Sequence, residues 1–390
     1  MKRFMVWAAW ISLVSLLPVM AISSPISSLP VNSDFSAIYN TDLALVHGIP
    51  IYDLEAVRAF VLPLSGIPDQ SFFLARFPYP AWYALSTFYL GFLPPHASAT
   101  LWFEINLLML LLSVWLLTDG WPGRIRLFLF PAALLFLPVL GALIVGQYDF
   151  PVLLGTSLLL YGLKKENIVP VVCGAMLVTF KPHIGALIFL FLLIWLFVRG
   201  NDFGRRSLKY IAIVLCGLIV SGFIADPNWI SGYIRMLLGY QNEGNVTSCS
   251  ECISLPMVIS RWLFDGSLQT AVMVSAVLLL LLAVFYYLRR DFLLRSPAIF
   301  ITAAVIAVLL ASPYFYNYDF ILLLIPFAVL FDQWKSWMMR LFLGLCHLAP
   351  LIAIGFYGRD GNISLIVVTA ILAFLFYSKT KGIDVPTQPA

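Results

Sequence analysis

Charged residues are scarce in this chain, and their scarcity excludes an ordinary soluble fold. Of 390 residues only 11% are Asp, Glu, Lys or Arg, whereas 62% are hydrophobic and the mean hydropathy is +0.96. Globular proteins carry about a quarter charged residues and about half apolar ones. A soluble domain cannot bury this much apolar surface, so we predict that lipid surrounds most of the fold.

Cysteine is also rare, and five cysteines exclude a disulfide-stabilised scaffold. Cys173, Cys216 and Cys346 lie inside apolar runs and are interpreted as small core residues. Cys249 and Cys252 form a C-x-x-C in a polar loop. Because a zinc site would need a second pair, the motif predicts either a local disulfide or two idle thiols.

Several functional signatures are missing from the sequence. It contains no P-loop, no G-x-G-x-x-G, no H-E-x-x-H and no G-x-S-x-G. No histidine and cysteine residues have metal-ligand spacing, so we expect no metal and no bound cofactor. The net charge of +4 is too small and too scattered to predict nucleic-acid binding.

Apolar runs recur along the whole chain at about the 20 residues that a transmembrane helix needs. They predict an all-α polytopic membrane protein in which residues 1–390 form a single transmembrane domain. The N-terminal run resembles a secretory signal, but an uncleaved first helix is the simpler interpretation. The twelve predicted spans are 4–22, 98–118, 125–145, 149–163, 167–181, 184–199, 206–225, 269–288, 296–311, 318–331, 340–356 and 362–377.

The basic residues select one topology, because Lys and Arg concentrate in cytoplasmic loops. With both termini in the cytoplasm, twelve spans place most of the 23 basic residues inside. Counting the apolar run 78–95 as a span would reverse every later loop, so we predict that it lies along, or dips into, the outer surface. The long outer loops are then 23–97 and 226–268, in a multi-pass protein of the plasma (inner) membrane. The basic residues left outside are Arg58, Arg76, Lys181, Arg235, Arg261 and Arg359.

This topology brings four short polar clusters to the outer face. Ionisable groups at membrane depth are costly and are functional candidates, and irregular backbone there usually lines a cavity. The clusters are Ser33-Asp34-Phe35, Gly146-Gln147-Tyr148-Asp149, Lys181-Pro182-His183, and residues 312–319 with the sequence SPYFYNYD.

Asp34 has two possible roles. Ser33 or Asp34 suits the N-cap of a following amphipathic helix. Alternatively, Asp34 is a general base at the membrane interface. The residues expected on the apolar face of that helix are Phe35, Ile38, Tyr39, Leu43 and Val46.

Three basic residues are candidates for binding a phosphate. Lys181 lies on the side where lysine is avoided, next to the helix-breaking Pro182, although it could also extend its ammonium group into lipid headgroups. His183 alone would be a satisfied polar residue, but beside Lys181 it is a second phosphate donor. Arg76 suits either a substrate phosphate or a lipid headgroup.

Six further residues are candidates for binding a sugar or an acceptor. Gln147, Asp149 and Asp319 carry amide or carboxylate groups that bind hydroxyls, but each is also a possible helix cap. The tyrosines offer rings for stacking on a sugar, or form an interfacial aromatic belt. They are Tyr79, Tyr316 and Tyr318.

Taken in order, these motifs resemble glycosyltransferase family 87, a GT-C-class family of integral membrane enzymes. The resemblance covers about residues 30 to 330. It rests on Asp34-Phe35 and the segment Gly48 to Asp53, on Phe77-Pro78-Tyr79-Pro80 followed by Leu101-Trp102, on Gly146-Gln147 and Lys181-Pro182, and on Ser312-Pro313-Tyr314 with Tyr318-Asp319.

The resemblance implies a hexosyltransferase that takes a sugar, expected to be mannose, from a polyprenyl-phosphate donor to a glycolipid or glycan acceptor. It implies that Asp34 is the base and that transfer inverts the anomeric centre. Two departures stand out. Many relatives carry histidine where this chain has Tyr318-Asp319, so a catalytic task of that histidine is either absent here or taken by another group such as His183. No second aspartate flanks Asp34, which argues against a metal-dependent variant.

Two other classes stay open. A transporter or flippase of lipid-linked or small solutes also suits twelve spans with broken helices. Against it, the two halves differ in hydropathy, and the polar residues cluster at one face rather than midway. A scaffold subunit of an envelope assembly is the third possibility.

Overall fold

The computed structural model consists of helices, and it contains no strand among the residues that it describes, which are 34–65, 74, 76–240, 252–334 and 336–381. The predicted all-α fold is therefore confirmed. The predicted first span, 4–22, lies outside the described residues.

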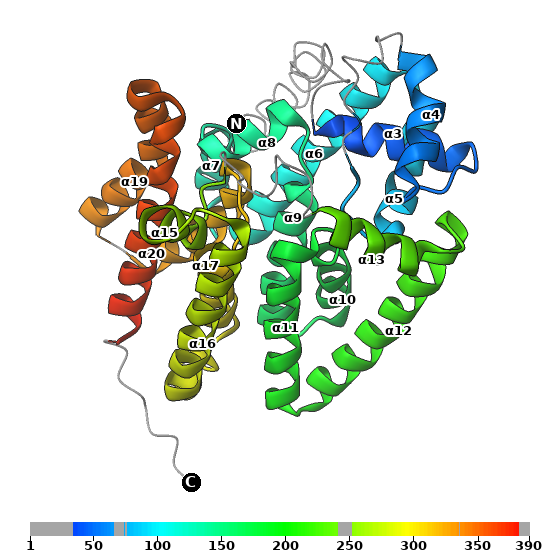
Figure 1. Ribbon diagram of the computed structural model, residues 1–390. Helices are drawn as coiled ribbons and strands as arrows, with labels where there is room; N and C mark the ends of the chain where they lie inside the picture. The colour runs from blue at the N-terminus through cyan, green and yellow to red at the C-terminus, as the bar shows by residue number, and fades with distance from the viewer. Residues whose placement is uncertain (1–33, 66–73, 75, 241–251, 335, 382–390) are drawn as a thin grey trace, which may run out of the picture.

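Long apolar helices run from the top to the bottom of the molecule in Figure 1. Within the described ranges, five are long and apolar enough to cross a membrane, or six if one bent pair counts as a single span. The bent pair is α7 (Gly123–Leu134) with α8 (Leu137–Val145), which meet at 61°. The chain is thus a membrane protein. The five candidates are α6 (Pro95–Leu117), α11 (Pro182–Arg199), α12 (Asp202–Ala225), α16 (Leu268–Leu293), and the stretch Trp337–Ser378, which runs through α19 (Trp337–Tyr357), η4 (Gly358–Ile363) and α20 (Ser364–Lys381).

Four of the predicted spans are shorter helices. Polar hinges interrupt the apolar runs at Gly146-Gln147, Lys181-Pro182 and Ser312-Pro313, and these four helices stay below the length that a membrane crossing needs, whereas α11 after Lys181 reaches it. The number of twelve spans therefore stays a prediction. The shorter helices are α9 (Asp149–Lys165), α10 (Ile168–Val178), α17 (Pro297–Ala311), and η3 (Asn317–Leu323) continued by α18 (Leu324–Gln333).

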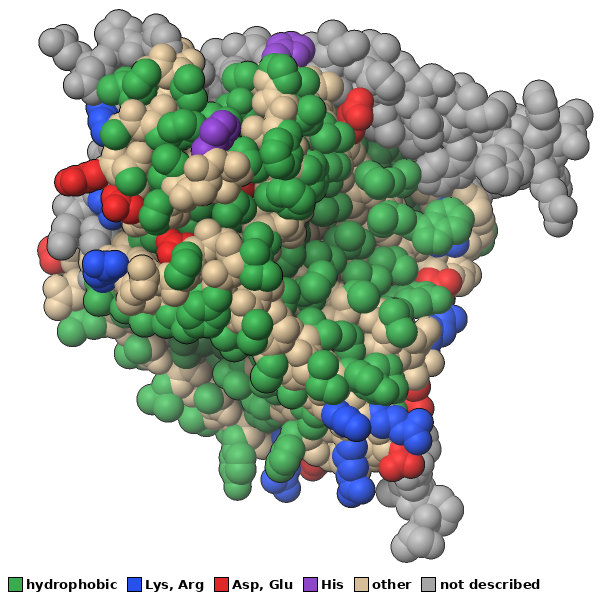
Figure 2. Space-filling view, turned by 90° about the vertical axis from the view of Figure 1, so that its right-hand side faces the viewer, with side chains coloured by type: hydrophobic (Ala, Val, Ile, Leu, Met, Phe, Trp, Pro, Cys, Tyr) green, Lys and Arg blue, Asp and Glu red, His purple; other side chains and the backbone are tan. Residues whose placement is uncertain are grey.

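Basic residues gather at the lower end of the long helices. Arg199 ends α11, Arg205 and Arg206 lie in the first two turns of α12, and the last turns of α16 carry Arg289 and Arg290. Figure 2 shows Lys and Arg at this lower end, below a broad apolar surface. This separation is what the positive-inside rule describes, and the assignment of this end to the cytoplasm stays a prediction.

Shorter helices cover the opposite, upper end. Segment 78–95, predicted not to span, contains only two short helices, which fall well short of the about 20 residues needed. The covering helices are α3 (Phe35–Val46), α4 (Leu54–Ser65), α5 (Ala81–Thr87), η2 (Phe88–Phe92), α13 (Trp229–Tyr240) and α15 (Leu255–Leu263).

The helix after Asp34 differs from the expectation. An amphipathic surface helix was predicted, but α3 is buried on nearly all sides, including the polar Ser36, Asn40 and Asp42. The reason is tertiary packing. Helix α3 lies against α4, α5 and η2, and a Cβ atom on Gly91 would come within 2.4 Å of the Asp42 carbonyl oxygen.

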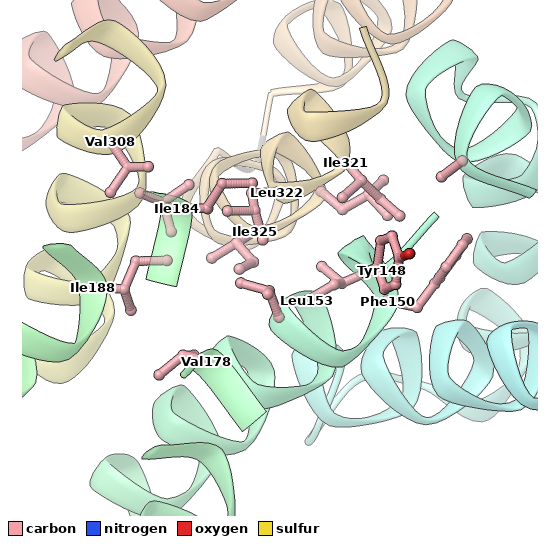
Figure 3. Close-up of a cluster of buried hydrophobic side chains, with 14 of the residues drawn as sticks. Tyr148, Phe150, Leu153, Val178, Ile184, Ile188, Val308, Ile321, Leu322 and Ile325 are labelled. Atoms are coloured by element: carbon pink, nitrogen blue, oxygen red, sulfur yellow. The ribbon is translucent and has the colours of Figure 1, made fainter. Parts of the chain in front are cut away.

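The core lies directly beneath this upper end. Figure 3 shows Tyr148 and Phe150 at the start of α9 together with Ile184 of α11 and Ile321 of η3, all of them buried. Tyr148, Phe150 and Ile184 are within three positions of a polar hinge, and Ile321 is two positions after Asp319. The apolar core therefore fixes the hinges relative to one another.

Candidate active site

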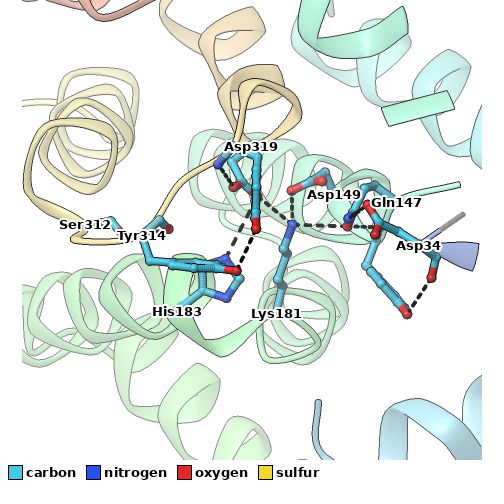
Figure 4. A network of polar contacts seen from close by, with 10 residues as sticks. Asp34, Gln147, Asp149, Lys181, His183, Ser312, Tyr314 and Asp319 are labelled. Carbon is cyan, nitrogen blue, oxygen red and sulfur yellow. Dashed lines mark hydrogen bonds and ion pairs between the residues drawn. The ribbon is translucent and has the colours of Figure 1, made fainter. Parts of the chain in front are cut away.

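A buried network of polar side chains joins the hinges, with Lys181 at its centre (Figure 4). The Lys181 ammonium lies 2.9 Å from Asp149 Oδ1 and 2.5 Å from Asp319 Oδ1. It also donates to Gln147 Oε1 at 3.4 Å. Lys181 is only 2% exposed, and both carboxylates are 1% exposed. A buried charge of this kind is tolerated only when it is paired and hydrogen-bonded.

The turn between α10 and α11 places Lys181 in the network. Helix α10 ends at Val178, and Pro182 occupies the first turn of α11, where its missing N–H costs nothing. The fold-back is tight, because a Cβ atom on Gly185 would lie 1.6 Å from the Val178 carbonyl oxygen. Lys181 therefore projects from a sharp turn rather than from a continuous helix.

The hinge between α8 and α9 places Gln147 and Asp149. Gly146 ends α8 with φ +69°, a left-handed conformation that glycine adopts without strain. The Gln147 N–H closes this turn by donating to the Ala142 carbonyl at 2.8 Å. Trp102 of α6 donates its indole N–H to the Gly146 carbonyl at 2.9 Å, which fixes the hinge against α6.

Asp34 does not act as a helix cap. It precedes α3, but its side chain makes no capping hydrogen bond. Its Oδ2 instead accepts the Gln147 Nε2–H at 2.6 Å, and the Tyr318 hydroxyl also hydrogen-bonds the carboxylate. Burial raises the pKa of the Asp34 carboxyl, while the bond from Gln147 and the charge of Lys181 lower it, and burial prevails.

The segment after α17 leads into η3, which supplies Asp319, and this residue has two roles. Its Oδ1 pairs with Lys181, and its Oδ2 accepts the Tyr316 N–H at 2.7 Å, so it caps η3 as well. The second long loop holds this segment in place. Ser254 donates to the Pro313 carbonyl, and the Ile253 N–H donates to the Phe315 carbonyl, both at 2.8 Å.

Aromatic rings surround the network. The Tyr318 ring centroid lies 5.1 Å from Lys181 Nζ, and Tyr316 stacks on Tyr318 with 5.2 Å between ring centroids. Tyr79 packs on Tyr148 with a centroid distance of 4.2 Å. Tyr148 was not among the predicted site residues, yet its hydroxyl donates to the Asp34 carbonyl at 3.3 Å. Its position between Gln147 and Asp149, two predicted site residues, is the feature of the sequence that marks Tyr148 as a further candidate.

The predicted phosphate-binding residues are not all together. His183 lies beside the network, with Nε2 4.0 Å from Asp319 Oδ1 and its side chain 34% exposed. Arg76 instead lines a separate cavity between the two long loops, together with Tyr52 and Arg235. The structure thus brings His183, but not Arg76, next to Lys181.

The network contains more carboxylates than cations. Three carboxyl groups, those of Asp34, Asp149 and Asp319, surround the single ammonium of Lys181. Asp149 Oδ2 is buried without a hydrogen-bond partner. Over the described part of the chain, no three His, Cys, Asp or Glu side chains are arranged to hold a metal ion, and the expectation of a metal-free reaction stays a prediction.

Cys173, Cys216 and Cys346 are free thiols. Only Cys346 is buried, so the prediction of a core position is wrong for Cys173 and Cys216, which lie on exposed faces of their apolar helices. Cys252 is disulfide-bonded, and Cys249 lies outside the described residues. Arg261 of α15 donates to the Cys252 carbonyl at 2.9 Å, which holds the backbone at Cys252 against this helix.

Fold and site together define an all-helical membrane protein with a buried lysine–carboxylate network at one end of its helices. The sequence profile of glycosyltransferase family 87 matches residues 77–313, more than half of the chain. The protein belongs to this family, and it is therefore a membrane glycosyltransferase. No curated protein and no solved structure matches it.

The family match covers only part of the network. Gln147, Asp149 and Lys181 fall inside the matched region, whereas Asp34 and Asp319 lie outside it. The fold brings the two outer residues to the three inner ones through direct contacts. These contacts link the unmatched ends of the chain to the family's core.

Proposed function

We propose that this glycosyltransferase moves a hexosyl group, with mannose the first sugar to test, from a polyprenyl-phosphate donor to a glycolipid or glycan acceptor at the outer membrane face. The observation that carries the proposal is the carboxylate of Asp34. It is held at 2.6 Å by Gln147, beside a buried lysine–carboxylate network, in a protein of a sugar-transferase family.

Asp34 acts as the general base in this reaction. Its carboxylate takes the proton of an acceptor hydroxyl as that oxygen attacks the anomeric carbon. The new C–O bond forms while the bond from the anomeric carbon to the phosphate oxygen breaks. Polyprenyl phosphate leaves with the electron pair, the configuration inverts, and Asp34 later passes its proton to water.

His183 and Lys181 serve the leaving phosphate. Negative charge grows on the phosphate oxygen as the bond breaks, so hydrogen-bond donors fixed beside it lower the barrier. Lys181 already contacts Asp149, Asp319 and Gln147, so it acts on the phosphate through the network rather than by direct contact. His183 is the exposed member and contacts the phosphate itself.

The lipid tail lies in an apolar groove of about 340 Å³ between α11, α16, α17 and α20. Leu310, at its upper end, is two residues before Ser312 of the late motif, and Leu293 lies at its lower end. Its side chains are aliphatic or aromatic, as a chain of isoprene units requires. The remaining lining residues include Phe191, Leu282, Tyr286, Ala307 and Phe376.

The donor class is tested with purified protein and three radiolabelled donors, namely polyprenyl-phosphate mannose, polyprenyl-phosphate glucose and a nucleotide-linked mannose. Transfer from a polyprenyl phosphate, with the product's anomeric configuration opposite to the donor's, supports the proposal. Transfer from the nucleotide sugar alone rejects the proposed donor. Transfer with retained anomeric configuration rejects the proposed mechanism.

A further inference from the structure

A second polar cavity, of about 460 Å³, lies between the two long loops and apart from the lysine network. We call it the loop cavity. Residues 50–55, Arg76 and Phe77 form one wall, and residues between Asp226 and Met236 form the other. Its lining includes the start of α4 and residues of α13, which lie on the right-hand side of Figure 1, the side that faces the viewer in Figure 2.

Close packing fixes the two walls of the loop cavity to each other. A Cβ atom on Gly232 of α13 would lie 2.9 Å from the Tyr52 Cβ. The Tyr52 and Tyr233 rings pack with 5.7 Å between their centroids. Asp53 and Asp226 are held by backbone N–H groups, from Ala56 at 3.0 Å and Asn228 at 2.8 Å. The polar groups therefore have set positions.

The charges of the loop cavity favour a neutral, hydroxyl-rich ligand. Two guanidinium groups and three carboxylates line it. A polyanion would meet the carboxylates, and a polycation would meet the arginines. A sugar hydroxyl both donates and accepts, so it can pair with either charge. The charged lining residues are Asp53, Glu55, Arg76, Asp226 and Arg235.

Three tyrosines connect the loop cavity to the reaction centre. The Tyr52 hydroxyl donates to the Tyr79 carbonyl at 2.7 Å. The Tyr79 ring packs on Tyr148, and the Tyr148 hydroxyl donates to the Asp34 carbonyl. These successive contacts join Tyr52 in the lining of the cavity to Asp34.

We propose that the loop cavity binds neutral sugar units of the acceptor, next to the unit whose hydroxyl faces Asp34. This inference rests on the proposed transferase function and adds the acceptor's class, an oligosaccharide or a glycolipid with several neutral sugars. Acceptor length then becomes a determinant of affinity, because each further sugar unit in the cavity adds hydrogen bonds to its charged lining.

The test measures direct binding to the full chain in detergent by saturation-transfer NMR, with mannose oligosaccharides of one to four units. Wild-type affinity should rise with length, and Arg235→Ala and Glu55→Gln should each weaken tetrasaccharide binding at least fivefold. Both side chains are exposed, so folding is preserved. Arg206→Ala, an exposed arginine of α12 outside the cavity, is the matched control and should leave binding unchanged.

Two results overturn the inference, and both are separable from failure of the transferase. Unchanged tetrasaccharide binding in both variants removes the cavity as a sugar site, even if wild type transfers sugar. If the two variants bind inorganic phosphate or anionic vesicles more weakly than wild type but keep oligosaccharide binding, the loop cavity is an anion site. If wild type transfers no sugar but the variants lose oligosaccharide binding, the cavity stands and the transferase proposal falls.

Discussion

Gln147 donates its side-chain N–H to the Asp34 carboxylate at 2.6 Å, although the two residues are 113 positions apart. The opposite end of the same amide accepts from Lys181 at 3.4 Å and from the Tyr148 N–H at 3.2 Å. Because the amide oxygen faces two donors, its NH₂ group must face Asp34. Gln147 thus couples the proposed base to the buried lysine.

The rate of sugar transfer should fall on acidification at a pH above that of an ordinary aspartate. Burial raises the Asp34 pKa, and the proposed base works only as a carboxylate. Activity is therefore present above this raised pKa and is lost as pH falls through it. The measurement is kcat/KM against pH for the acceptor. An acidic midpoint at or below 3.8, the ordinary value, contradicts the assignment.

Replacing Gln147 by alanine should move that midpoint further up. The hydrogen bond from Gln147 stabilises the charged carboxylate and lowers its pKa, so losing this bond raises the pKa further. The internal control is the high-pH plateau, where Asp34 is ionised in both proteins and rates should agree within a few fold. A large plateau loss with no midpoint shift would instead show that Gln147 orients substrate.

Replacing Lys181 by methionine should destabilise the protein. It leaves Asp149 and Asp319 buried without their cation, at a cost of about 3–5 kcal/mol. The measurement is the thermal unfolding midpoint in detergent. Adding Asp319→Asn to Lys181→Met should restore part of the stability, because one buried charge is removed, but it should not restore transfer. Equal midpoints for wild type and Lys181→Met would contradict a stabilising role for the network.

The apolar groove can be tested with two leucines of α16. Leu282 lines it, whereas Leu280, two residues away on the same helix, is 65% exposed and does not. Leu282→Trp should narrow the groove and raise KM at least fivefold for a long polyprenyl donor, but not for a donor with a single isoprene unit. Leu280→Trp should change neither. If Leu282→Trp and Leu280→Trp change KM equally, or if Leu282→Trp raises KM equally for the long and the short donor, the groove is not the binding site of the lipid tail.

Much of the helical layout follows from the sequence. The runs at 98–118, 184–199 and 269–288 correspond to α6, α11 and α16, because apolar length marks such helices without tertiary information, and arginines end α11 and α16. The clearest difference is the predicted span 125–145, which forms two helices, α7 and α8, that meet at 61°. Pro138 lies in the first turn of α8, where a new helix starts readily.

The site was predictable as a set of residues but not as a set of bonds. Gln147, Asp149, Lys181 and Asp319 share unusual chemistry in an apolar sequence, which marks them individually. That Lys181 pairs with two carboxylates at once depends on how three hinges meet, and local sequence does not encode this. The same holds for α3, whose polar residues predicted an exposed face and are buried by neighbours more than 40 positions away.

The role of Asp34 as the base is tested most directly by sugar transfer from radiolabelled polyprenyl-phosphate mannose, comparing purified wild type with Asp34→Asn. Asparagine keeps the shape of the side chain but cannot accept the proton, so the variant should lose transfer at least a hundredfold. Donor binding, measured in the same preparations, should change little. Transfer by the variant at near wild-type rates would contradict the central claim. Binding of several lipid-linked sugars without turnover by either protein would favour transport instead.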